Sequence, residues 1–289
     1  MRRLALAAAF AGIGSAVFAH DTWFEPLAAA RPGEQRLALG TGNQFPVHDS
    51  AIDPIYLRQQ GCRSADAALP LTALNLTDTA LLMSAPSSAR SCWAQLAPFE
   101  ITLPADKIAV YLNEVRPAQP VLDAWAAISA RGLPWKERYT KHARIVLAGA
   151  GEAARQPSGM AMDVLLETAA APLRTGSPLA VQVLREGQPL AGLAVEFRND
   201  RARISLWRRS DADGRVGFQP PLPGQWVLRG VDLRLSARVP DSWDSDFITL
   251  AFEVQPQNGS TLKLNTRSAS QTPEITAISS EPPTNTARW

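Results

Sequence analysis

The second half of the chain carries short strand-like runs separated by turn signals about every 8–12 residues. Leu179–Leu184 is rich in β-branched and apolar residues, Glu186–Pro189 is a turn, and Leu193–Phe197 is suited to be the hairpin partner. A further turn signal follows at Asp211–Gly214. This spacing predicts an immunoglobulin-like β-sandwich over residues 160–255.

The first half is also β-rich. Residues 20–150 contain alternating runs, of which Glu100–Leu103 and Ile108–Leu112 are the clearest, and both predict strands. Glu137–Leu147 alternates over a longer stretch and predicts a further strand. The small and polar segment 149–159 then marks the expected boundary between the two domains.

One short helix is expected near 120–131. Pro120 suits the first helical position, apolar residues recur every three positions over Leu122–Ile128, and Gly132 is placed to end the helix. The segment 256–289 is rich in Ser, Thr and Pro, which favours a flexible tail. The sequence therefore predicts an all-β fold with two β-rich regions and one short helix.

Residues 1–19 have the features of a secretory signal peptide. Arg2 and Arg3 precede the apolar run Leu4–Phe10, and Ala19 suits the residue before a cleavage site. The alternative is a membrane anchor, but the apolar stretch is short and glycines interrupt it. We therefore expect a periplasmic or secreted protein with no stable membrane insertion after cleavage.

Charge and cysteine content agree with export. The formal net charge is +2, and removal of Arg2 and Arg3 leaves 27 basic against 27 acidic side chains. A neutral chain without a basic block argues against a nucleic-acid partner. The two cysteines, Cys62 and Cys92, are expected to form a disulfide, because exported proteins meet an oxidising compartment.

Cleavage after Ala19 would make His20 the first residue. Its free amine and its imidazole Nδ1 can then chelate one Cu²⁺ or Ni²⁺ ion together. His142, or instead His48, could supply a third nitrogen, with Asp21 and Glu25 as outer partners that orient an imidazole. The alternatives are that His142 is a hydrogen-bonded sheet residue and that His48 lies on an exposed loop.

Hydrolytic motifs are absent from the sequence, since neither G-x-S-x-G nor H-E-x-x-H occurs. We therefore expect a non-enzymatic metal-binding protein more than an enzyme. A cell-envelope scaffold that binds a protein or glycan without metal is the main alternative, and it predicts that the three histidines lie far apart. A copper oxidase with a histidine brace is a third reading.

Five segments together resemble a known family of exported bacterial proteins. They are Ala19–Pro26 (AHDTWFEP), Glu137–Arg144 (ERYTKHAR), Val183–Gly192 (VLREGQPLAG), Ser210–Gly214 (SDADG) and Trp243–Phe252 (WDSDFITLAF). In this order they resemble the domain-of-unknown-function family DUF4198, which carries a nickel-uptake (NikM-like) label.

The resemblance implies a periplasmic, all-β protein whose second half is related to carboxypeptidase-regulatory-like sandwich modules. It also implies nickel or copper binding for uptake, with a metal transporter of the cell envelope as partner. This chain departs from histidine-richer members, because Gly230–Asp232 and Thr22 stand where further histidines would be sought. The resemblance therefore does not extend to a complete multi-histidine site.

Overall fold

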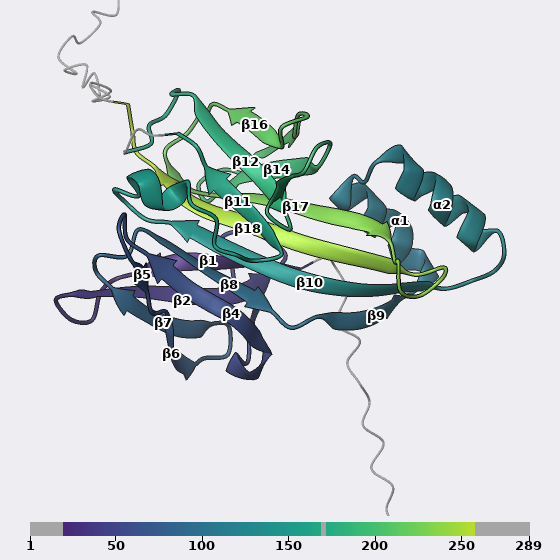
Figure 1. Ribbon diagram of the computed structural model, residues 1–289, viewed down its shortest axis with the longest axis horizontal. Coiled ribbons are helices and arrows are strands. Elements are labelled where there is room, and N and C mark those ends of the chain that lie inside the picture. Colours follow the sequence, from purple (N-terminus) through teal and green to yellow (C-terminus); the bar gives the residue numbers. More distant parts are fainter. Residues whose placement is uncertain (1–19, 169–171, 258–289) are drawn as a thin grey trace, which may run out of the picture. The chain divides into compact units, whose positions relative to one another are not determined.

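The computed structural model describes residues 20–168 and 172–257 (Figure 1). The predicted signal peptide and nearly all of the predicted tail lie outside the described residues. The described chain folds mainly into β-strands arranged in three sheets, with two α-helices, which confirms the all-β prediction. By their contacts the described residues form one compact unit.

A nine-stranded sheet, here called the central sheet, forms the middle of the fold, and the other elements pack against it. Its strands are, in order across the sheet, β15 (Ser205–Arg209), β14 (Ala194–Asn199), β17 (Gly224–Leu235), β18 (Trp243–Val254), β10 (Trp135–Val146), β8 (Ser91–Leu96), β4 (Leu57–Arg63) and β5 (Ala68–Leu69), with β9 (Phe99–Leu103) paired to β10. The pairing of β10 with β18 is parallel, whereas the other pairs are antiparallel.

Two smaller sheets pack on the central one. The N-terminal sheet contains, in order, β1 (Asp21–Leu27), β2 (Glu34–Gly42), β7 (Leu81–Pro86) and β6 (Thr72–Leu76), with β3 (Ser50–Ala51) paired to β2. The C-terminal sheet contains β11 (Met162–Leu166), β12 (Leu179–Arg185) and β13 (Gln188–Pro189), with β16 (Arg215–Phe218) paired to β12. Two short 3-10 turns, η1 and η2, lie at Pro54–Tyr56 and Gly151–Ala154.

Strand alternation gives the central sheet two apolar faces, because successive side chains point to opposite sides. One face, here called the N-face, presents Ala143, Ile145 and Ala251 to the core under the N-terminal sheet. The other, the C-face, presents Ile248 and Leu250 to the core under the C-terminal sheet. The second core has the sandwich packing that was predicted for residues 160–255.

The helices cover the part of the N-face that the N-terminal sheet leaves open. The predicted helix near 120–131 is α2 (Gln119–Ser129), but a second helix, α1 (Ala105–Val115), precedes it. The predicted strand at Ile108–Leu112 is therefore wrong. Ile108, Tyr111 and Val115 are buried at helical spacing, and this apolar face packs with Trp135 and Trp243, whose rings stack 4.6 Å apart.

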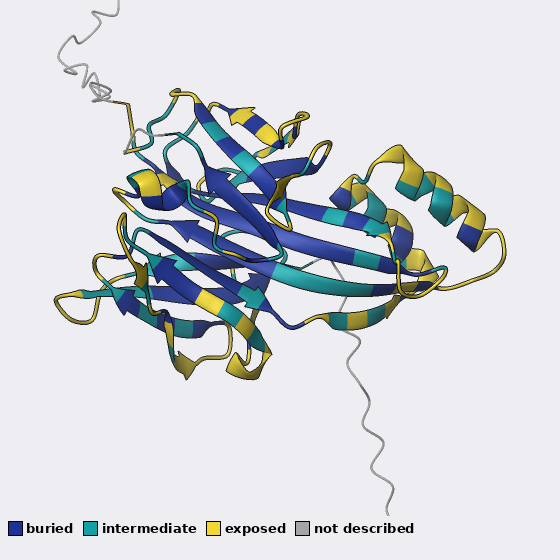
Figure 2. Cartoon of the chain, in the orientation of Figure 1, coloured by how far each residue is buried: buried dark blue, intermediate teal, exposed yellow. Residues whose placement is uncertain are grey.

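The segment 149–159, expected to separate two domains, lies between β10 and β11. The two halves nevertheless share the central sheet, because β10 comes from the first half and pairs directly with β18 from the second. Figure 2 shows that the strands meeting there are buried over most of their length. His142 from the first half and Arg229 from the second are therefore positioned by one continuous sheet.

The predicted disulfide is confirmed, since Cys62 and Cys92 are bonded directly across β4 and β8. Both cysteines are fully buried in the core on the N-face. A buried structural disulfide is typical of proteins from an oxidising compartment, which supports export. Among the described residues, no helix is both long and apolar enough to cross a membrane.

Candidate functional site

The start of β1 is fixed by a buried ion pair. Asp21 is 4% exposed, and its Oδ2 accepts a hydrogen bond of 2.8 Å from Nη1 of Arg229 on β17. The same guanidinium donates from Nε to Glu196 at 2.6 Å and from Nη2 to the backbone carbonyl of Glu114 at 2.8 Å. Arg229 therefore joins β1 to the central sheet and to α1 through all three of its nitrogens.

Electrostatics explain how Arg229 and Glu196 remain ionised in the interior. Burial alone opposes the charge of Arg229, but Asp21 and Glu196 outweigh it and raise the pKa of the guanidinium. Burial likewise opposes the charge of Glu196, yet Arg229, with smaller contributions from Ser205 and Arg198, holds its pKa below the usual value. The cluster is thus a mutually neutralising network and not a free set of catalytic groups.

His20 directly precedes this anchored strand and is half-buried. Next to it, Oδ1 of Asp21 is buried without a hydrogen-bond partner, although Oδ2 of the same carboxylate is paired with Arg229. Thr22, the residue after Asp21, is held as well, because its backbone carbonyl accepts a hydrogen bond of 2.6 Å from the hydroxyl group of Thr249. The predicted chelating residue therefore precedes a strand that is held by Arg229 and Thr249, and the next residue carries a buried carboxylate oxygen without a hydrogen-bond partner.

The other expected outer partner lies elsewhere along the same strand. Glu25 is five residues from His20, and an extended strand rises about 3.3 Å per residue, so their backbones are separated by about 16 Å. Glu25 pairs with Ala38 on β2 and is half-buried, and its burial raises the pKa of the carboxyl group. Its carboxylate is thus placed away from the start of β1.

His48 packs against β1 through an aromatic contact. Its ring lies 4.8 Å from the ring of Trp23 and passes directly over Gly40, where a Cβ atom would come within 2.4 Å of the imidazole Cγ. Its Nε2 is buried without a hydrogen-bond partner, and burial lowers the pKa of the ring. Because Gly40 has no Cβ atom, the imidazole of His48 can approach β2 this closely.

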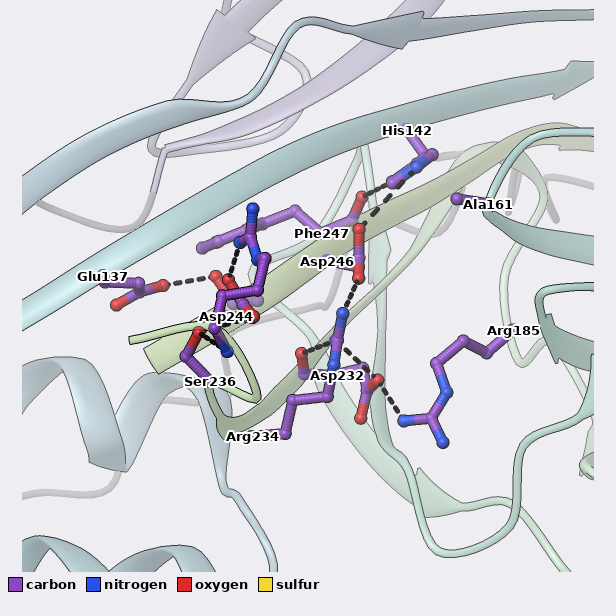
Figure 3. A network of polar contacts seen from close by, with 12 residues as sticks. Glu137, His142, Ala161, Arg185, Asp232, Arg234, Ser236, Asp244, Asp246 and Phe247 are labelled. Atoms are coloured by element: carbon purple, nitrogen blue, oxygen red, sulfur yellow. Dashed lines mark hydrogen bonds and ion pairs between the residues drawn. The ribbon is translucent and has the colours of Figure 1, made fainter. Parts of the chain in front are cut away.

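His142 lies in a different environment, on β10 (Figure 3). It is 1% exposed; its Nδ1 is 3.1 Å from the carbonyl oxygen of Phe247, and its Nε2 is 3.8 Å from Oδ1 of Asp246. Burial lowers its pKa, an effect that Asp246 and the contact with Phe247 only partly oppose. A hydrogen-bonded, neutral sheet histidine is the arrangement that this environment favours.

The central sheet separates His142 from β1, against which His48 packs. His142 pairs with Ile248 and shares its side of the sheet, the C-face, whereas β1 packs against Thr249 and Arg229 on the N-face. His20 and His142 are therefore on opposite sides of the sheet. Across residues 20–168 and 172–257, no group of three or more His, Cys, Asp or Glu side chains could hold a metal ion.

An open cleft lies over the Arg229 network. It has a volume of about 720 Å³ and is bounded by the loop 43–47, by residues 198–205 and by Glu114. Arg229 and Glu196, which hold Asp21 through the contacts above, form part of its lining. The anchored start of β1 is thus linked by direct contacts to a solvent-open polar surface.

A known protein family matches most of this chain. The family model described as "Domain of unknown function (DUF4198)" matches residues 17–231, well over half of the chain. This chain belongs to the DUF4198 family. No curated protein matches it. The DUF4198 match covers four of the five sequence segments that carried the resemblance, and Trp243–Phe252 lies beyond its end in the middle of β17.

Sequence reasoning did not find the Arg229 network of this DUF4198 protein. The signal that could have revealed it is a pair of isolated charges inside apolar strand segments, Glu196 within Ala194–Phe197 and Arg229 within Val227–Val231. A charge in such a segment must find an opposite charge, because an unpaired buried ion is very costly. The partner Asp21 is 208 residues away and could not be inferred from spacing.

Proposed function

We propose that the mature protein begins at His20 and binds a transition-metal ion there, nickel or copper, as an exported metal-handling protein of the periplasm. The amine and the imidazole Nδ1 of a first-residue histidine form a chelate suited to Cu²⁺ or Ni²⁺. The observation that carries the proposal is the buried, unpaired Oδ1 of Asp21 beside this residue on a strand fixed by Arg229.

The proposed site is incomplete, and this suits transfer better than storage. His20 contributes two nitrogens, Asp21 one oxygen at most, and His142 lies across the sheet. Positions left open on a bound ion can be filled by ligands of another protein, such as a metal transporter of the cell envelope. An oxygen-activating copper enzyme would need a second histidine on the same ion. Because His142 lies across the sheet, this role would fall to His48, which packs against Trp23 of β1, and we rank this proposal last.

The test compares two chains that differ only in the chelate. One begins at His20, and the other carries a single additional alanine before His20, which keeps the imidazole but turns the amine into an amide. We expect Cu²⁺ and Ni²⁺ to bind the first chain with micromolar or tighter affinity by calorimetric titration. We expect the second chain, and His20→Ala in the first, to bind at least tenfold more weakly. Equal affinity of the two chains would overturn the proposal.

The alternative is a metal-independent interaction module of the cell envelope. It is favoured by the separation of His142 from β1 and by the polar clefts on the surface of the fold. If this alternative is correct, neither Cu²⁺ nor Ni²⁺ should stabilise the chain that begins at His20 against thermal unfolding. A rise in Tm with metal that the added alanine abolishes would decide against it.

A further inference from the structure

A second cleft opens on the C-face, where the C-terminal sheet ends and the long strands of the central sheet continue. Its volume is about 370 Å³, and strands β4, β8, β10 and β18 contribute to its walls together with the turn after β12. Along β10 the burial changes at this point, from buried at His142 to half-buried at Arg138–Lys141 (Figure 2). The cleft therefore lies where the cover of the C-terminal sheet over the central sheet ends.

Two of the arginines that line it are already held by carboxylates. Arg234 donates to Asp246 at 2.7 Å and to Asp232 at 3.0 Å (Figure 3). Arg238 is paired with Asp244. These pairs neutralise the aspartates of the cleft. Because each guanidinium is fixed by an ion pair, Arg234 and Arg238 form a preorganised wall.

The other two arginines have no such partner. Within the described part of the chain, neither Arg58 nor Arg138 forms an ion pair or a side-chain hydrogen bond, although both line the cleft. Arg138 is half-buried on β10, two residues from Thr140, whose side chain faces the same side of the strand. Each guanidinium offers five N–H donors in a planar fork.

The remaining charges leave a positive excess. With the aspartates paired, Glu186 is the one carboxylate lining the cleft that forms no ion pair in the described residues, against Arg58 and Arg138. Only Leu96, Pro98 and Ala161 add apolar side chains to the lining. A cleft of this kind selects a small, polar, negatively charged ligand and disfavours a hydrophobic one.

The geometry points to a binding site for a small anion that carries a carboxylate or phosphoryl group, with Arg58 and Arg138 as its donors. Planar guanidinium groups bind both of these groups through two parallel hydrogen bonds. A monoanion balances the excess charge of the cleft. The site is independent of a metal at His20, because the cleft lies on the C-face and β1 lies on the N-face.

The experiment is a calorimetric titration of the mature protein at low ionic strength with inorganic phosphate and, separately, with succinate. Sodium chloride at the same ionic strength is the reference. We expect at least one probe to bind with a millimolar or lower Kd. Arg138→Gln and Arg58→Gln should each weaken that binding at least tenfold, because each removes one guanidinium.

The matched control is Arg203→Gln. Arg203 is exposed, lines the cleft over Arg229 and also forms no ion pair among the described residues, so its loss should leave the affinity unchanged. Arg138→Lys keeps the charge without the planar fork and should give an intermediate affinity. Circular dichroism verifies folding, and the exposed Arg58 keeps the test decisive if Arg138→Gln does not fold.

Two results would overturn the inference. One is that neither phosphate nor succinate binds the folded protein beyond the effect of sodium chloride. The other is that Arg203→Gln weakens binding as much as Arg138→Gln, since the anions would then respond only to overall charge. Binding of phosphate alone, or of succinate alone, supports the site and identifies the geometry of the group that it prefers.

Discussion

The two faces of the central sheet use arginine in opposite ways. On the N-face, Arg229 is buried, and all its nitrogens are satisfied by Asp21, Glu196 and a backbone carbonyl. On the C-face, Arg58 and Arg138 line an open cleft without an ion pair in the described residues. The first arrangement holds the fold together, whereas the second leaves N–H donors for a ligand. An arginine whose donors are all satisfied within the protein is therefore structural, and one without an ion pair is a candidate for ligand binding.

Arg229→Met should have the largest effect. It leaves Asp21 and Glu196 as buried carboxylates without their main counter-charge, which typically costs about 3–5 kcal/mol of the free energy of unfolding. Urea denaturation followed by tryptophan fluorescence measures the loss. A loss below about 1 kcal/mol would show that Arg229 is not the anchor of β1.

Removal of the disulfide tests the core under the N-terminal sheet. The Cys62→Ala, Cys92→Ala double variant should lose roughly 3–4 kcal/mol, because the cross-link closes a loop of about 31 residues in the unfolded chain. Wild-type protein unfolded under reducing conditions is the control and should show a similar loss. If the double variant were as stable as the oxidised protein, the bond would not contribute to the stability of this core.

His142 should make stability depend on pH in the acidic range. Its pKa is lowered from the ordinary value of 6.5 by burial, so the unfolded chain binds a proton that the folded chain resists. The contribution of His142 to stability is thus fully present above pH 6.5. It is lost as the pH falls from 6.5 through the lower pKa of His142 in the folded protein. The slope is at most about 1.4 kcal/mol per pH unit for one proton.

The control for this pH dependence is His142→Gln, which cannot be protonated. Denaturation curves between pH 7.5 and 5 should show a smaller decrease in stability for the variant than for the wild type. An identical decrease would assign the dependence to other groups.

Arg138→Gln should have the smallest effect on folding. Its guanidinium has no ion pair to lose, and such surface changes are usually within about 0.5 kcal/mol. Urea denaturation beside Arg229→Met gives the comparison directly. A loss of several kcal/mol would remove the distinction between the two kinds of arginine.

Local patterns in the sequence predicted much of the fold. The strand alternation around His142, the helix near 120–131 and the disulfide were all found, because each depends on short-range periodicity or on compartment. The error at Ile108–Leu112 arose because a short apolar run fits a strand or one face of a helix. Packing of Tyr111 and Val115 against Trp135 selects the helix.

The candidate sites depended more on tertiary structure. Spacing could not show that His20 and His142 fall on opposite sides of one sheet, because this follows from the parallel pairing of β10 with β18. The C-face cleft was also hidden, since Arg58, Arg138 and Glu186 meet only after three distant segments pack together. The residue types in the sequence identified candidate ligands, whereas the topology of the sheets determines which of these side chains lie close enough to bind the same ligand.

The most direct test is a Cu²⁺ titration of the chain that begins at His20, carried out in parallel on the wild type and on His142→Gln at pH 7.5. We expect the two affinities to be equal within error, because the central sheet lies between His142 and the proposed ligands. A tenfold or greater loss of affinity in the folded His142→Gln variant would contradict this, since it would place His142 at the metal.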